Sequence, residues 1–185
     1  MRLAAIGLAG VLLISGCGGD GGDPEGREPR EWVADVCGAV GSWTSGIQDE
    51  STALGESAQG AENLAQARNQ FVDFFDQVIA RTDRMLTQID DAGTPAVDDG
   101  EAIAEDLRNT LEPIQDAFED ARDDAENLPT DDPAAFQEGA TQIGETVQEE
   151  AQEISRAFDV LEREYDVPEL DEAFEEEEAC SEISS

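Results

Sequence analysis

Apolar residues recur at intervals of three and four along most of this chain, and this spacing constrains the fold more than any other feature. It is clearest over residues 133–165, where an apolar side chain recurs at almost every helical turn. Such spacing places apolar side chains on one face of an α-helix, whereas a half-buried strand alternates with a period of two. No segment of the chain shows that alternation. The stripe consists of Phe136, Ala140, Ile143, Val147, Ala151, Ile154, Phe158, Leu161 and Tyr165.

The same spacing predicts three further long helices and a short helix near the C-terminus. Long amphipathic helices joined by short links pack as antiparallel neighbours around one apolar core. The sequence therefore predicts an all-α fold, an antiparallel up-down four-helix bundle with a short C-terminal helix. The predicted helical segments are residues 30–48, 61–90, 99–125, 133–165 and 169–179.

Capping and helix-breaking residues predict where these helices begin and bend. Asp132 is a good N-cap and Pro133 a good first helical residue, and Asp98 or Asp99 can cap the third helix. Pro113 lacks a backbone donor inside that helix, so a kink is expected there. Residues 49–60 are rich in Ser, Gly and acids and are predicted to form a loop.

Most aromatic residues lie on the apolar stripes, so packing in the core is their expected role. Phe74 stands beside Phe75 and either widens the core stripe or faces outward as part of a partner groove. In the short last helix, Leu170 and Phe174 are expected to face inward. The aromatic residues on the long stripes are Trp32, Trp43, Phe71, Phe75, Phe118, Phe136 and Phe158.

The first residues have the pattern of a secretion signal. Arg2 supplies a positive charge, and residues 3–14 are apolar. This apolar run is shorter than the roughly 20 residues that a permanent transmembrane helix needs. It ends in Ile14-Ser15-Gly16-Cys17, which resembles the lipobox of bacterial lipoproteins. The resemblance implies transfer of a diacylglyceryl group to Cys17, cleavage before this residue, and anchoring to the outer face of the cell membrane.

The resemblance divides the chain into a processed leader, a tether and one domain. Residues 1–16 are the predicted signal peptide, and residues 17–29, rich in Gly and acids, are the predicted lipidated tether. Residues 30–180 form the predicted bundle domain, followed by a tail at 181–185. The alternative for the leader is an ordinary secretory signal in which the cysteine occurs by chance.

The charge of the chain is extreme and restricts its partners. The sequence has 46 Asp and Glu but only 10 basic residues, all of them Arg, giving a formal net charge of −36. Removal of the leader takes away Arg2 and no acid, which leaves −37. Such a chain repels nucleic acid and anionic lipid and favours cationic partners.

The composition and the cysteine positions carry a second, looser resemblance. The absence of Lys with frequent Ala and Arg is similar to the composition of actinobacterial proteins. A Trp-rich first helix with a cysteine, and a last cysteine near the terminus, resembles small secreted helical proteins of unknown function in that group. This resemblance assigns no site residue.

Two cysteines remain once Cys17 is assigned to lipidation. Cys37 lies in the first predicted helix and Cys180 follows the last, and an exported protein meets an oxidising environment. A disulfide between them is predicted, while two free thiols or a thiol nucleophile are the alternatives. Without any histidine, the common Cys–His activation of a nucleophile cannot occur.

The absence of histidine also removes several other kinds of site. A Ser-His-Asp triad, a His-containing zinc site and the Glu-x-x-His motif of di-iron bundles are all excluded. Carboxylate pairs remain available for glycoside hydrolysis, but 46 acids make chance pairs unavoidable. Residues 98–101 and 175–178 are dense in oxygen ligands without the EF-hand spacing, so weak cation condensation is expected there. No cofactor, metal site or catalytic residue is predicted.

Three functions are consistent with this pattern. The first is a non-catalytic, membrane-anchored lipoprotein that acts as a binding or scaffold module at the cell envelope, with the membrane and a cationic envelope protein as partners. The second is a carboxylate-based glycan hydrolase. The third is a weak cation-binding or surface-charge protein. The missing histidines and the absence of a nucleophile motif favour the first.

Overall fold

The computed structural model describes residues 26–183, apart from some side chains between residues 150 and 163, those of 58–59 and those after 180. The predicted signal peptide, Cys17, most of the predicted tether and residues 184–185 lie outside this part of the chain. Helices make up nearly all of the described region, and the all-α prediction is confirmed. The helices are α1 (Pro29–Gln59), α2 (Leu64–Ala92), α3 (Gly100–Glu126), α4 (Pro133–Glu164), α5 (Pro168–Glu176) and α6 (Glu178–Ile183).

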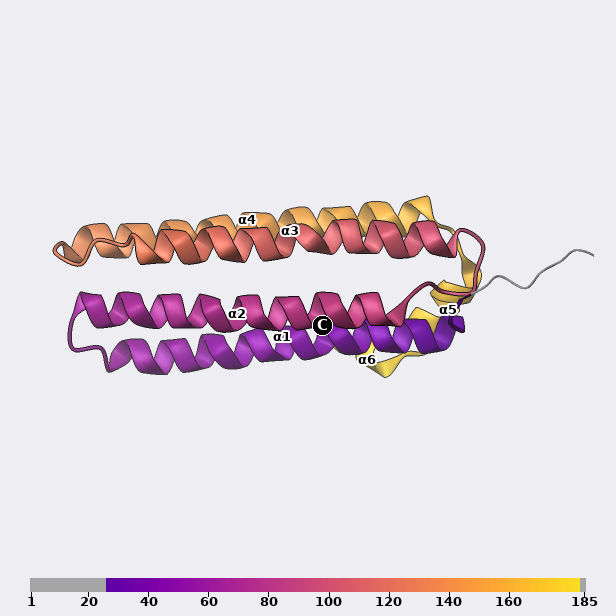
Figure 1. Cartoon of the computed structure of the whole chain (residues 1–185), viewed down its shortest axis with the longest axis horizontal. Coiled ribbons are helices and arrows are strands. Elements are labelled where there is room, and N and C mark those ends of the chain that lie inside the picture. Colours follow the sequence, from indigo (N-terminus) through magenta and orange to yellow (C-terminus); the bar gives the residue numbers. More distant parts are fainter. Residues whose placement is uncertain (1–25, 184–185) are drawn as a thin grey trace, which may run out of the picture.

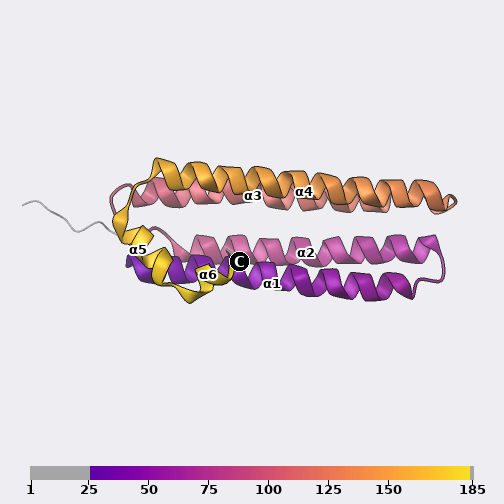
Figure 2. The same cartoon turned by 180° about the vertical axis from the view of Figure 1, so that it is seen from behind.

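The four long helices lie side by side along the long axis of the molecule (Figure 1). In backbone packing, α2 lies between α1 and α3, and α4 lies against α3. The links 60–63 and 127–132 share one end, here called the far end, and the link 93–99 lies at the other end. Seen from behind, α5 crosses at that second end from α4 to α1, where α6 follows it (Figure 2).

Helix α1 is eleven residues longer at its C-terminus than the sequence predicts, so the prediction of a loop at 49–60 is wrong. Contacts from α2 hold these added turns in place. Arg81 donates to the Glu50 carboxylate at 2.6 Å, and the Gln70 side-chain amide donates to the Ser57 carbonyl at 3.1 Å. Polar residues that favour a loop locally are therefore held helical by the neighbouring helix.

The predicted short helix at 169–179 is two helices, separated at Glu177, and α6 runs into the predicted tail. Leu170 is buried as expected, but the expectation for Phe174 is wrong, since 40% of this residue is exposed. Helix α5 packs against α1 and, less extensively, against α6, and it presents Leu170 and Ala173 to the interior. Phe174 lies about 40° around the helix from Leu170, on the side away from Ala173, and so at the edge of this contact.

The end of the predicted tether belongs to the folded domain, because it pairs with the link between α2 and α3. The Arg27 amide donates to the Thr94 carbonyl at 2.8 Å, and the Ala96 amide donates to the Arg27 carbonyl at 2.7 Å. A Cβ atom at Gly26 would lie 2.7 Å from the Thr94 carbonyl oxygen, so this approach requires glycine. We call the end where residues 26–28, the link 93–99 and α5 meet the entry end.

Of the residues predicted to cap helices, Asp132 forms a capping hydrogen bond and Asp99 does not. Asp132 caps α4 as expected, since its carboxylate accepts a 2.9 Å hydrogen bond from the Ala134 amide. Asp99 stands at the N-cap of α3 with φ +58°, but its side chain forms no capping bond. Helix α3 begins instead at Gly100, where a Cβ atom would lie 2.1 Å from the Pro95 carbonyl oxygen. The helix continues through Pro113, whose side chain is exposed.

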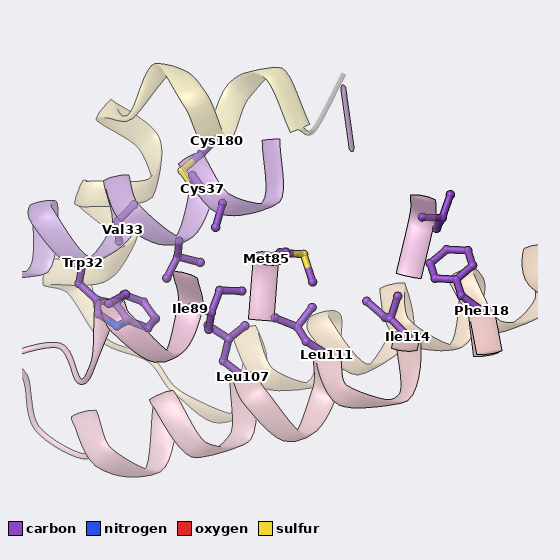
Figure 3. Close-up of a cluster of buried hydrophobic side chains, with 14 of the residues drawn as sticks. Trp32, Val33, Cys37, Met85, Ile89, Leu107, Leu111, Ile114, Phe118 and Cys180 are labelled. Carbon is purple, nitrogen blue, oxygen red and sulfur yellow. A yellow bond between two sulfur atoms is a disulfide. The ribbon is translucent and has the colours of Figure 1, made fainter. Parts of the chain in front are cut away.

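The long helices enclose one apolar core (Figure 3). The prediction that the aromatic residues pack in the core is confirmed wherever their side chains are described. The side chain of Phe158 lies outside the described part of the chain. Trp32, Phe75, Phe118 and Phe136 are buried, while Trp43 and Phe71 are partly buried against the core. Phe74 also packs there, edge-to-face on Phe75 at 5.0 Å between ring centroids, so it widens the stripe.

One polar side chain, that of Thr82, is completely buried within this core. Its hydroxyl donates to the Val78 carbonyl at 3.0 Å and accepts a 2.9 Å hydrogen bond from the Trp43 indole N–H. The threonine thus satisfies an indole donor that would otherwise lie in an apolar setting. This pair joins α1 to α2 in the middle of the domain.

We predict that Thr82→Val destabilises the domain by about 1–3 kcal/mol, because valine keeps the shape but leaves the Trp43 N–H without an acceptor. Denaturant unfolding measures the difference. Thr87→Val is the matched control on the same helix, since Thr87 is exposed and bonds only to the Asp83 carbonyl. It should change stability by less than about 0.5 kcal/mol. Equal effects of the two substitutions would contradict this account.

Candidate functional site

The two cysteines predicted to pair do form a disulfide. Cys37 in the third turn of α1 and Cys180 in α6 are linked across 143 residues, with their Cα atoms 5.1 Å apart. Both residues are buried, at 5% and 8% exposure. The disulfide therefore fastens the C-terminal helices to α1 and leaves neither thiol free as a nucleophile. The predicted lipidation residue, Cys17, lies outside the described residues.

The carboxylates lie on the surface wherever their side chains are described. None of these Asp or Glu residues is buried, and only Glu50, Asp106 and Glu177 are half-buried. Glycoside hydrolysis of the usual kind needs a carboxyl group shielded enough to stay protonated near neutral pH. The described residues provide no such shielded pair.

Several arginines connect neighbouring elements through pairs that no local sequence pattern indicates. Arg81 of α2 pairs with Glu50 of α1 at 2.6 Å, and Arg108 of α3 pairs with Asp90 of α2 at 2.5 Å. These cations lie where two acidic helices approach each other, so they reduce the repulsion between them. The other pairs between elements are Arg122 with Asp76, Arg30 with Glu172 and Glu176, and Arg27 with Asp35.

The acidic segments 98–101 and 175–178 lie apart from each other on the described surface. Within the described part of the chain, no group of three or more Asp, Glu or Cys side chains is arranged to hold a metal ion. Residues 98 and 99 form a turn before α3, and residues 175–178 span the break between α5 and α6. Their carboxylates are solvated at separate points on the surface or, like Glu176, paired with arginine.

Two shallow grooves lie between neighbouring helices. One, of about 420 Å³, runs between α2 and α3 and combines five carboxylates with Arg108. The other, of about 510 Å³, lies between α1 and α2 and is lined mainly by small residues of α1, among them Ala34, Gly38 and Ser42. Both grooves are open to solvent. The carboxylates of the first are Asp83, Asp90, Glu112, Asp116 and Glu119.

The only tyrosine of the chain has an unusual environment near the entry end. Tyr165, just after α4, donates a 2.6 Å hydrogen bond to the Asp106 carboxylate on α3. This hydrogen bond, partial burial of the phenol and the nearby negative charges raise the pKa of Tyr165 to about 12 from its usual value near 10. The pair lies 59 positions apart, and no local pattern in the sequence indicates it.

Comparison with known proteins gives no functional lead, because no protein-family model, curated protein or solved structure matches this chain. Within residues 26–183, no helix combines the length and the apolar character that membrane crossing requires.

We predict that the phenol of Tyr165 titrates near pH 12 in the folded protein, which phenolate absorbance measures directly. Because its folded pKa is raised, the hydrogen bond contributes stability below about pH 10, and this contribution is lost as the pH rises toward 12. Asp106→Asn should lower the midpoint toward 10 by removing the charged acceptor, and Asp99→Asn, which removes a weaker charge effect, should lower it less. A wild-type midpoint near 10 would show that the hydrogen bond is absent in solution.

Proposed function

We propose that this protein is an exported bacterial lipoprotein, processed before Cys17 and held on the outer face of the cell membrane by lipid on that residue. Its domain is a non-catalytic binding or scaffold module of the cell envelope. The observation that carries this proposal is the division of the domain into an apolar core and a surface that holds every described carboxylate. Such a domain interacts with other molecules through the charge and the shape of its surface.

The disulfide supports export independently of the signal sequence. Disulfides persist in oxidising compartments and are rare in the cytosol, where thiols are kept reduced. Cys37 and Cys180 are paired and buried, which is the expected state of structural cysteines in an exported domain. The lipobox-like residues 14–17 and the disulfide thus support export to an oxidising compartment independently of each other.

The finer fold that we propose is an antiparallel up-down four-helix bundle. The order of neighbours α1, α2, α3 and α4 follows the order of the chain, and the connecting links alternate between the two ends of the domain (Figure 1). This connectivity supports an up-down topology, with α5 and α6 added to the flank of α1.

The pairing of residues 26–28 with the link 93–99 shortens the proposed tether. It then spans the nine residues 17–25, which can reach no further than about 32 Å. The lipid would hold the entry end close to the headgroups, and the far end of the domain could extend away from the membrane. A partner would meet the sides of the long helices and the links 60–63 and 127–132.

The charge of the domain defines the partner that we propose. With −37 on the processed chain, a like-charged partner is repelled, whereas a basic protein face is attracted over a distance set by the ionic strength. Membrane anchoring raises the local concentration of such partners. We therefore propose a cationic envelope protein as the partner and exclude nucleic acid.

Changing Cys17 to Ser tests the anchor. We predict that the Cys17→Ser protein carries no lipid and either stays unprocessed or is released into the medium, because serine offers no thiolate for the lipid transfer. Fractionation and intact mass measure this outcome. Cys37→Ser is the control, and it should leave the lipid attached. A Cys17→Ser protein that is processed normally and stays in the membrane would overturn the lipoprotein assignment.

Crosslinking in native cells tests the binding function. We predict that the domain captures a basic envelope protein, and that capture by the purified domain weakens as NaCl rises from about 0.01 M to about 1 M, where the Debye length falls from about 30 Å to about 3 Å. Capture that does not depend on salt would contradict the electrostatic proposal. Turnover of a glycan by the purified domain, lost on removal of one carboxylate, would replace it with the hydrolase.

A further inference from the structure

Helices α5 and α6, residues 168–183, are here called the C-terminal strap. In backbone packing the strap lies against α1, and its two helices lie against each other (Figure 2). The hydrogen bond from Tyr165 to Asp106 holds the chain to α3 just before the strap begins. The strap is thus a separate layer on one flank of α1, joined to the remainder through residues 165–167.

The flank of α1 that carries Cys37 is apolar only where the strap covers it. Val33, one turn before Cys37, is completely buried, and Figure 3 shows it close to the disulfide. Beyond the strap the same flank continues with Thr44, Gln48 and Ser51, which are half-buried or exposed. The strap therefore hides an apolar strip that ends about where the strap itself ends.

Both helices of the strap pack closely against α1, but few of their described side chains are apolar and buried. Where side chains of the strap are described, Leu170 and Ala173 are buried besides Cys180, and Ala179 is partly buried. Arg30 pairs with Glu172 at 3.7 Å and more closely with Glu176. Electrostatic repulsion opposes these contacts. Eight of the sixteen strap residues are acidic and none is basic, and the remainder of the domain is also strongly negative. The net charge thus opposes the contact that the disulfide holds closed.

We propose that the disulfide is a redox-controlled lock, and that its reduction releases the strap from α1 while the four long helices stay folded. A protein or small-molecule dithiol supplies the electrons. One of its thiolates attacks Cys180 or Cys37, forms a mixed disulfide and displaces the other cysteine as a thiolate. The second thiol of the reductant then closes its own disulfide, leaving two cysteine thiols in this protein.

A reductant can reach the buried sulfurs because α6 is short. A six-residue helix at the end of the described chain has little stability of its own, so local opening of α6 exposes the disulfide without unfolding α1. Most of the core lies between the long helices, and Leu170, Ala173 and Cys180 of the strap complete it beside α1. Its central residues, among them Met85, Leu111 and Ile114, lie between α2 and α3 (Figure 3).

In the oxidised protein the strap occupies the apolar strip of α1 and blocks it from other contacts. In the reduced protein this strip, centred on Val33 and Cys37, becomes accessible close to the entry end. The redox state of the envelope thus decides whether the strap covers this part of α1. This inference depends on the disulfide and the strap, and not on the lipid anchor or the cationic partner.

Hydrogen exchange on the processed domain, with and without dithiothreitol as the dithiol, tests this proposal. In the reduced protein, amides of the strap should exchange at least about tenfold faster, while amides of α2 and α3 change by less than about twofold. Loss of protection in all helices together would overturn the proposal, because the strap would then be part of one cooperative unit. A strap that stays protected after complete reduction would overturn it as well.

The double variant Cys37→Ser, Cys180→Ser is the matched control. Its strap should exchange rapidly without dithiothreitol and should not respond to it, whereas α2 and α3 should match the oxidised protein. Where this variant fails to fold, reduced wild-type protein provides the same measurement. Arg30→Gln in the oxidised protein should leave the strap protected, since the disulfide remains; a released strap there would assign its attachment to the ion pairs instead.

Discussion

The burial of the apolar stripes between four long helices is the interaction on which everything else in this protein depends. A chain with 46 acids has little to hold it together except apolar surface, because most acid pairs on its exterior repel each other. The core is correspondingly continuous, from Trp32 near the entry end to Phe136 at the far end. Because Thr82 is bonded to both Val78 and Trp43, its hydroxyl can lie inside this core without an unpaired group.

Three arginines lie at the boundaries between acidic helices, where they reduce electrostatic repulsion. Arg81, Arg108 and Arg122 of α2 and α3 each reach an acid on a neighbouring helix. Exposed pairs of this kind contribute only about 0–1 kcal/mol each, so they do not replace the core. They place positive charge at the boundaries between helices, while the outward faces stay almost entirely negative. A surface of this kind favours a basic partner and agrees with the proposed binding role.

The two ends of the domain differ in how firmly they are held. At the far end, links of four and six residues join the long helices, and the latter ends at the Asp132 cap. At the entry end, residues 26–28 pair with the link 93–99, and the Trp32 indole donates to the Gly93 carbonyl at 2.9 Å. The disulfide adds the C-terminal strap there. The proposed lipid anchor is thus attached to the end with the most cross-connections, which suits a domain that must hold its position at a membrane surface.

The sequence by itself determined the helical class, four long helices to within a few residues at most ends, the Asp132 cap and the cysteine pair. These features follow from periodicity within a few turns, or from the elimination of other partners for Cys37 and Cys180. Tertiary structure alone decided the rest. The last turns of α1 are helical because Arg81 and Gln70 of α2 contact them. Phe174 is exposed because α5 lies on the outside of the domain, where α1 and α6 cover only part of its surface. Such contacts join residues far apart in the chain, and their energies have no counterpart in any local pattern.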